Sequence, residues 1–314
     1  MIIDLISILK SSINSISCSF NSGGLVLSHL ILLQARSCKK YKVEFHISTQ
    51  ASISNIEAAK FYKKLGAKRL VLARELNLKQ IKEISKIIDL EVFGHGAMCV
   101  SVSGRCFMSQ FLFNQSANRG KCLQPCRRSY CVDDNQGNKL KLQNNYVMSA
   151  KDLCSLPFIE KLKKTGIKSL KIEGRNREPE YVEQVIKIYR KALDQKFGKK
   201  EIESGLEDLN KVYNKGFSSG FFLGLPTSDD FSNQEHSSST QTKKYIGRIQ
   251  HYFSKKKVAI LEIFSGEIKI GDELIVLGKN IGVKRFNIKS MEIEHKEVKI
   301  AKKGQQVGIY LPEV

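Results

Sequence analysis

Short apolar runs alternate with amphipathic stretches from residue 43 onward, and this alternation constrains the fold of the chain more than any other feature. Runs rich in Val, Ile, Leu or Phe occupy residues 43–48, 69–73, 90–93 and 169–172. Stretches with apolar side chains at helical spacing occupy residues 55–65, 78–88, 156–164 and 179–195. Repeated βα units of this kind form parallel sheets covered by helices. We therefore predict an α/β fold of the TIM-like (βα) barrel type.

The predicted barrel is incomplete at its N-terminal end. A complete (βα) barrel needs eight strands and about 250 residues. Only four clear strands precede residue 180, with a weaker candidate at residues 15–20, and the first 42 residues are irregular with a stretch rich in Ser and Asn. A barrel that lacks strands would expose sheet edges and part of its core.

Polar side chains follow the predicted strands at their carboxyl ends. They include Gln50, Arg74, His95, Glu173 and Arg175. In a (βα) barrel, the carboxyl ends of the strands form the edge at which active sites are built, although polar residues also begin ordinary surface loops. His95 and Glu173 each end a strand at this edge, so they are the candidates for general acid–base catalysis.

The last part of the chain predicts a separate all-β domain. Residues 232–242, SNQEHSSSTQT, contain no hydrophobic residue and are typical of an interdomain linker. Beyond them, short strand-like runs alternate with Gly-containing turns, which predicts a small β-barrel of about 70 residues. This barrel resembles the second domain of translation elongation factors, a fold that commonly contacts RNA. The predicted divisions are a partial (βα) barrel at 1–231, a linker at 232–243 and the β-barrel at 244–314.

The charge of the chain favours a polyanionic partner. Lys and Arg number 52 against 31 Asp and Glu, which gives a net charge of +21. A Lys-rich composition alone could account for part of this excess. The chain has no uninterrupted apolar stretch of about 18 residues and no signal-peptide pattern, so we predict a cytoplasmic protein without a membrane span.

Cysteines cluster in the middle of the chain. Four of them fall within 28 positions, namely Cys99, Cys106, Cys122 and Cys126. In a reducing compartment, clustered thiols are more often metal ligands or catalytic groups than disulfides. Four thiolates can hold a zinc ion or an iron–sulfur cluster, and the absence of paired Cys-x-x-Cys motifs favours the cluster. The alternative is that the thiols are buried and act as small hydrophobic groups.

Basic residues surround these cysteines. They are Arg105, Arg119, Lys121, Arg127 and Arg128. Positive charge lowers the pKa of a nearby thiol and stabilises the thiolate that a metal requires. The same side chains could instead bind an anionic substrate or a phosphate backbone.

The cysteine segments resemble the signature of peptidase family U32, a collagenase-like family whose catalytic type was never assigned. The resemblance lies in residues 91–106, EVFGHGAMCVSVSGRC, and in residues 116–127, SANRGKCLQPCR. Residues 46–50, HISTQ, 72–75, LARE, and 170–175, LKIEGR, resemble the other barrel segments of the family. The predicted C-terminal barrel resembles the last domain of many members.

This resemblance implies redox chemistry as well as proteolysis. Several members are oxygen-independent hydroxylases that carry a four-iron four-sulfur cluster. They act on a uridine in the anticodon of tRNA, with prephenate linked to the reaction, on a cytidine in rRNA, or on a ubiquinone precursor. By position, the resemblance assigns ligands to Cys99, Cys106 and Cys122 and leaves the fourth open between Cys126 and Cys154.

Three functions stay open from the sequence. The favoured one is iron–sulfur-dependent hydroxylation of a base in tRNA or rRNA, because the cysteine cluster, the cations and the net charge occur together. The residues expected to bind carboxylate or phosphate groups of the substrate are Gln50, Arg74, Arg119, Arg127, Arg128, Arg175 and Arg177. The first alternative is a collagenase-like peptidase in which Cys99 and His95 pair as nucleophile and base. The second is a non-catalytic RNA-binding protein.

Overall fold

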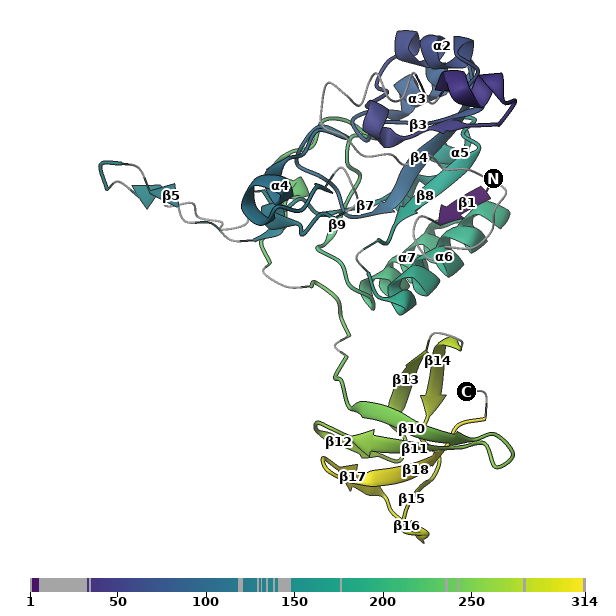
Figure 1. Ribbon diagram of the computed structural model, residues 1–314, viewed down its shortest axis with the longest axis vertical. Coiled ribbons are helices and arrows are strands. Elements are labelled where there is room, and N and C mark those ends of the chain that lie inside the picture. Colours follow the sequence, from purple (N-terminus) through teal and green to yellow (C-terminus); the bar gives the residue numbers. More distant parts are fainter. Residues whose placement is uncertain are drawn as a thin grey trace. The chain divides into compact units, whose positions relative to one another are not determined.

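The chain forms two compact units, Met1–Thr240 and Gln241–Val314 (Figure 1). The structure, a computed structural model, describes residues 2–5, 33, 35–117, 121–128, 130, 132–133, 135–137, 139–140, 148–175, 177–234, 237–241, 243–278 and 281–312. The weaker strand candidate at residues 15–20 lies outside these ranges. Within them, no helix is long and apolar enough to cross a membrane.

A seven-stranded sheet organises the first unit. Its main path contains five parallel strands in the order β1 (Ile2–Leu5), β8 (Ser169–Glu173), β4 (Asp89–Gly96), β3 (Arg69–Val71) and β2 (His46–Ile47). Two further strands extend it, with β7 (Asp152–Cys154) antiparallel to β4 and β9 (Phe217–Ser218) parallel to β7. The predicted parallel α/β sheet is therefore confirmed. The described strands run in an open order, and closure into a TIM-like barrel stays a prediction.

Helices connect and cover these strands. The predicted helical stretches correspond to α2 (Ile56–Lys64), α3 (Leu78–Ser85), η4 (Leu156–Phe158) with α5 (Ile159–Lys163), and α6 (Pro179–Asp194). Further elements are α4 (Met108–Phe113), α7 (Lys199–Asn210), η1 (Thr49–Ala51), η3 (Pro125–Arg127), η5 (Ser228–Asp230) and the hairpin β5 (Val132–Asp133) with β6 (Lys139–Leu140). In Figure 1, α6 and α7 lie on the side of β8 and β1.

Local sequence signals mark the start of three helices, two of them through a capping side chain. The side chain of Asn55 accepts a hydrogen bond from the backbone N–H of Ala58 at 2.8 Å and begins α2. Asn77 and Gln80 bond each other's backbone N–H groups at 3.0 Å and form a capping box for α3. Helix α6 begins at Pro179, where a missing N–H costs nothing because first-turn N–H groups have no helical partner.

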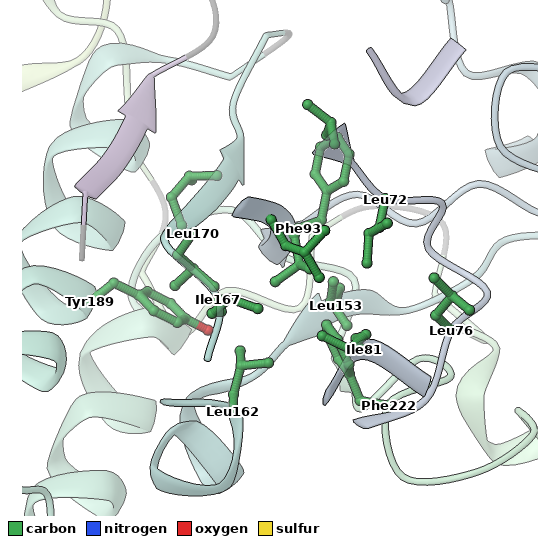
Figure 2. Close-up of a cluster of buried hydrophobic side chains, with 14 of the residues drawn as sticks. Leu72, Leu76, Ile81, Phe93, Leu153, Leu162, Ile167, Leu170, Tyr189 and Phe222 are labelled. Carbon is green, nitrogen blue, oxygen red and sulfur yellow. The ribbon is translucent and has the colours of Figure 1, made fainter. Parts of the chain in front are cut away.

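The core of the first unit packs around β4 and β8 (Figure 2). Gly94 on β4 allows close packing there, because a Cβ atom at this position would lie 2.5 Å from the buried side chain of Leu170 on β8, which would have to shift. The hydroxyl of Tyr189 on α6 donates to the carbonyl of Gly94 at 3.1 Å and accepts from the N–H groups of Ser155 and Leu156 at 3.0 and 3.2 Å. This buried hydroxyl therefore ties α6 to β4 and to the chain that follows β7.

The second unit is built from antiparallel strands, as predicted. Five of them form a sheet in the order β10 (Gly247–Phe253), β11 (Val258–Ile263), β18 (Gln306–Tyr310), β15 (Met291–Ile293) and β16 (Lys296–Glu297). Two-stranded sheets join β12 (Glu267–Lys269) to β17 (Ile300–Lys302) and β13 (Glu273–Gly278) to β14 (Gly282–Asn287). Alternate residues of β11 are buried in a separate core, the pattern of a sheet with one apolar face.

The polar segment before this unit bonds to the first unit. The N–H of Ser232 donates to the carbonyl of Ser149 at 2.7 Å, and that of Thr240 donates to the carbonyl of Asn210 at 2.8 Å. The boundary between the units, at residues 240 and 241, falls within the predicted linker.

Candidate functional site

A cavity of about 170 Å³ lies at the carboxyl ends of the central strands. Its lining comes from the four strands that the sequence predicts. Gln50 follows β2, Arg74 follows β3, and Glu173 ends β8. Phe93 lies on β4, and the chain that follows β4 also lines the cavity. Parallel strands bring their carboxyl ends to one edge of a sheet, which is why residues far apart in the sequence meet here. Gln50, Arg74 and Glu173, which we expected at the carboxyl ends of strands, therefore line one cavity.

Four cysteines line this cavity. Cys99 follows β4, Cys106 precedes α4, Cys122 lies between α4 and η3, and Cys126 lies in η3. Cys99 is exposed and the other three are half-buried. Burial raises the pKa of the Cys126 thiol to about 11, against the opposing charge of Arg127, and smaller rises come from the other three thiols.

Hydrogen-bond donors point at two of these sulfurs. Arg74 Nη1 donates to Cys99 Sγ at 3.1 Å, and the backbone N–H of Gln124 donates to Cys122 Sγ at 3.3 Å. The hydroxyl of Ser109 on α4 lies 3.9 Å from Cys122 Sγ. Donors of this kind stabilise the negative charge of a thiolate. Within the described ranges, no three His, Cys, Asp or Glu side chains are arranged to hold a single metal ion.

The carboxylate of Glu173 lies in another part of the cavity lining, close to two arginines. Arg74 Nη2 lies 3.4 Å from Glu173 Oε2 and Arg175 Nη2 lies 3.8 Å from the same oxygen. The backbone N–H of Arg175 donates to Glu173 Oε1 at 3.2 Å. The Arg74 guanidinium also stacks 3.9 Å from the centre of the Phe93 ring, so one side chain joins Cys99, Glu173 and Phe93. Buried Lys171 on the same wall pairs with Glu91 at 2.6 Å.

Gly96 allows β4 to end against Glu173. Its φ of +112° is a conformation that L side chains rarely adopt, and a Cβ atom there would collide with the carbonyl oxygen of Glu173. The two strand ends are thereby brought together at the cavity.

The structure does not bring His95 or Cys154 to the cavity. They pair across β4 and β7, and they are 1% and 2% exposed. Burial lowers the pKa of His95 to about 4 and raises that of Cys154 to about 11, although the hydrogen bond between Cys154 and Tyr189 opposes the rise at Cys154. The His95 ring packs against Tyr181, Tyr189 and Phe217, with centroids 5.4 to 6.0 Å away. This environment suits a neutral core residue and corrects the catalytic placement expected for His95.

A β-bulge explains where His95 lies. Phe93 pairs with Lys171 and His95 pairs with Ile172, so β4 contains one extra residue, Gly94, relative to β8. Residues two apart in a strand normally share a face, and a bulge breaks that rule. Phe93 and Lys171 therefore line the cavity, whereas His95 and Ile172 are buried in the core.

Asp152 is a buried ionic residue that the sequence pattern did not single out. Its Oδ1 lies 2.8 Å from Arg127 Nη2, and its Oδ2 lies 3.8 Å from Arg177 Nη2 and accepts from the N–H of Lys215 at 3.2 Å. Arg127 Nη1 is buried with no hydrogen-bond partner among the described residues. Asp152 thus holds Arg127, the neighbour of Cys126, at the cavity wall.

Three more arginines were predicted to bind substrate. The structure describes two of them, and neither lines the cavity. Arg177 stacks 4.0 Å from the centre of the Tyr213 ring and does not line the cavity. Arg128 is exposed and stacks over Phe113 at 4.9 Å. Arg119 lies outside the described residues. Gln50, Arg74, Arg127 and Arg175 are the predicted substrate-binding residues that the cavity gathers.

Comparisons with known proteins agree on one family. The family model described as peptidase family U32 matches residues 16–232. A protein named collagenase from Porphyromonas gingivalis is 40% identical over 289 residues, covering 86% of this chain and 69% of that protein. A tRNA hydroxylation protein from Bacillus subtilis is 34% identical over 274 residues, covering 83% and 64%.

Two further likenesses are partial. A 23S rRNA 5-hydroxycytidine synthase from Escherichia coli is 42% identical over 154 residues, covering 48% of this chain and 23% of that protein. The solved C-terminal domain of a U32 peptidase from Geobacillus thermoleovorans is 20% identical, with a TM-score of 0.21, and covers 23% of this chain and 84% of that domain.

Proposed function

The chain belongs to peptidase family U32, and on this basis we propose that it is an iron–sulfur-dependent enzyme that hydroxylates a base in tRNA or rRNA. The observation that carries the proposal is the gathering of four cysteines around one cavity that also contains Glu173 and several cationic side chains. Relatives named for tRNA hydroxylation and for 23S rRNA 5-hydroxycytidine synthesis support RNA as the substrate.

We propose that the four cysteines hold a four-iron four-sulfur cluster rather than a zinc ion, because their sequence lacks the paired Cys-x-x-Cys motifs typical of zinc sites. A four-iron four-sulfur cluster is held by four Cys thiolates, and four cysteines share this cavity. We assign the fourth ligand to Cys126, because Cys154 does not line the cavity. When bound, the cluster would supply one-electron redox chemistry.

The other lining residues have separate tasks. Arg74 bonds both Cys99 and Glu173, so it fixes the carboxylate relative to the thiol. Glu173 is the candidate to accept a proton from the substrate. Lys171, Arg127 and Arg175 supply positive charge for carboxylate or phosphate groups. These cations also suit prephenate, the dicarboxylate co-substrate that the family resemblance suggests.

Peptidase activity is the second candidate, supported by the relative named collagenase. A cysteine peptidase needs a base beside its nucleophile. The described lining contains no histidine, and His95 is buried among aromatic rings rather than beside Cys99. The geometry therefore gives this alternative less support.

Iron analysis of protein purified without oxygen tests the proposal. We expect about four irons and four sulfides per chain, and loss of most of this iron in Cys106→Ser. Cys38→Ser is the matched control, because Cys38 is half-buried like Cys106 but does not line the cavity. Iron-free wild-type protein would overturn the cluster.

The reaction is tested separately in cells that lack the gene. Nucleoside mass spectrometry should detect a hydroxylated pyrimidine in tRNA or rRNA when the wild-type gene is restored, and not with Glu173→Gln. Cleavage of gelatin that survives iron chelation and disappears in Cys99→Ala would establish the peptidase instead.

A further inference from the structure

An exposed apolar surface lies beside the cavity. We call it the α4 surface and define it by Phe107, Phe111 and Leu112, which are 43%, 85% and 53% exposed. Phe107 and Phe111 are four positions apart, so they lie on one side of the helical turn. Contiguous exposed apolar side chains mark interaction sites more often than scattered ones do.

The α4 surface is continuous with the cavity. Cys106 and Met108, the neighbours of Phe107 in the sequence, both line the cavity. Two more exposed apolar residues, Val100 and Val102, also belong to its lining. A ligand that reaches into the cavity with one group would therefore contact the α4 surface with the groups next to it.

The charge around this surface indicates the chemistry of its partner. Residues 97–132 contain five Arg and Lys residues and no Asp or Glu. Arg105, Lys121 and Arg128 are exposed, and the Arg128 guanidinium already stacks over the Phe113 ring at 4.9 Å. Exposed aromatic rings interleaved with cations, without acidic groups, match single-stranded nucleic acid.

We propose that the α4 surface stacks the unpaired bases that flank the target base in an RNA loop. Phe111 and Phe107 supply the stacking rings, and Arg105, Lys121 and Arg128 contact the phosphates. This inference rests on the proposed function and adds to it a means of selecting loops, since bases paired in a helix have no free face for these rings.

Binding measurements on substituted proteins test the inference. Fluorescence anisotropy is measured at fixed salt with two labelled probes, an anticodon stem-loop and a duplex of the same stem. Phe111→Ala should weaken binding to the stem-loop about 5- to 150-fold, the range for one base stacked on an aromatic ring. Phe111→Tyr keeps the ring and should retain binding. Leu225→Ala is the control, because Leu225 is 84% exposed and lies outside the α4 surface.

Salt dependence separates stacking from charge. Phe111→Ala should leave the slope of log Kd against log salt unchanged, whereas Arg105→Ala should reduce its magnitude by about one. Iron content and far-UV circular dichroism equal to those of the wild type would show that each variant is folded.

Other outcomes would overturn the inference in distinct ways. If Phe111→Ala binds the stem-loop as tightly as the wild type, the inference fails while the proposed function stands. If Phe111→Ala instead abolishes self-association and leaves RNA binding intact, the α4 surface is an interface between copies. If the wild type binds neither the stem-loop nor an rRNA hairpin, the proposed function fails together with the inference.

Discussion

Replacement of Asp152 by Asn should destabilise the first unit by about 3–5 kcal/mol, the usual result of removing one partner from a buried ion pair. Asp152 is fully buried, and its two arginine partners, Arg127 and Arg177, have side chains that are 5% and 9% exposed. Asn keeps the shape of the side chain but removes the negative charge. Two buried guanidinium groups would then lack a counter-charge, and the new amide N–H₂ would face other donors. Because a domain is typically stable by about 5–15 kcal/mol, this loss would be a large share of the total.

Urea unfolding followed by far-UV circular dichroism measures this loss. Asp194→Asn is the matched control, since it breaks an Asp–Arg pair on the exposed face of α6, with a side chain that is 56% exposed, and should leave the unfolding midpoint unchanged. Adding Arg177→Met to Asp152→Asn should restore part of the stability by removing one uncompensated charge. A loss below about 1 kcal/mol in Asp152→Asn would refute the reasoning, because it would mean that solvent already screens these charges.

Three more predictions follow from the same geometry. When protein is prepared without oxygen, iron analysis should show that Cys126→Ser loses its iron and that Cys154→Ser keeps it. The reverse result would assign the fourth ligand to Cys154 instead of Cys126. The pKa of His95 falls from 6.5 to about 4 on folding, so the unfolded chain binds more protons in this range. The free energy of unfolding should therefore keep its full value above about pH 6.5 and fall by up to about 3 kcal/mol as the pH drops to about 4. Urea unfolding at several pH values measures this loss. His95→Gln should remove the pH dependence in this range, whereas His251→Gln, at an exposed site, should not. Gly96→Ala should cost about 1–3 kcal/mol through backbone strain and further through collision with Glu173, which would lower the thermal midpoint by several degrees; an unchanged midpoint would contradict the role given to this glycine.

The regular elements could be predicted because their signals are local. The apolar run at residues 169–172 corresponds to β8, and the helical pattern at residues 179–195 corresponds to α6. Residues at the ends of parallel strands meet at one edge, so the positions of the apolar runs in the sequence are enough to place Arg74 and Glu173 together.

The positions of Asp152, His95 and Cys154 depend on contacts that the sequence does not display. Asp152 lies in a three-residue strand that pairs with β4 and β9, and beside Lys151 it resembles an ordinary surface residue. Cys154 is drawn into the core by the same pairing, which spacing along the chain could not reveal. His95 is turned inward by one extra residue, and alternation along β4 predicts the opposite face.

That extra residue lets one strand serve two chemically different environments. If β4 paired regularly through Gly94, this glycine would lie opposite Ile172 and His95 opposite Glu173, and the imidazole would lie on the side of the sheet that Phe93 faces, where Cys99 lies. The separation between the His95 ring and the Cys99 thiol thus depends on the bulge at Gly94.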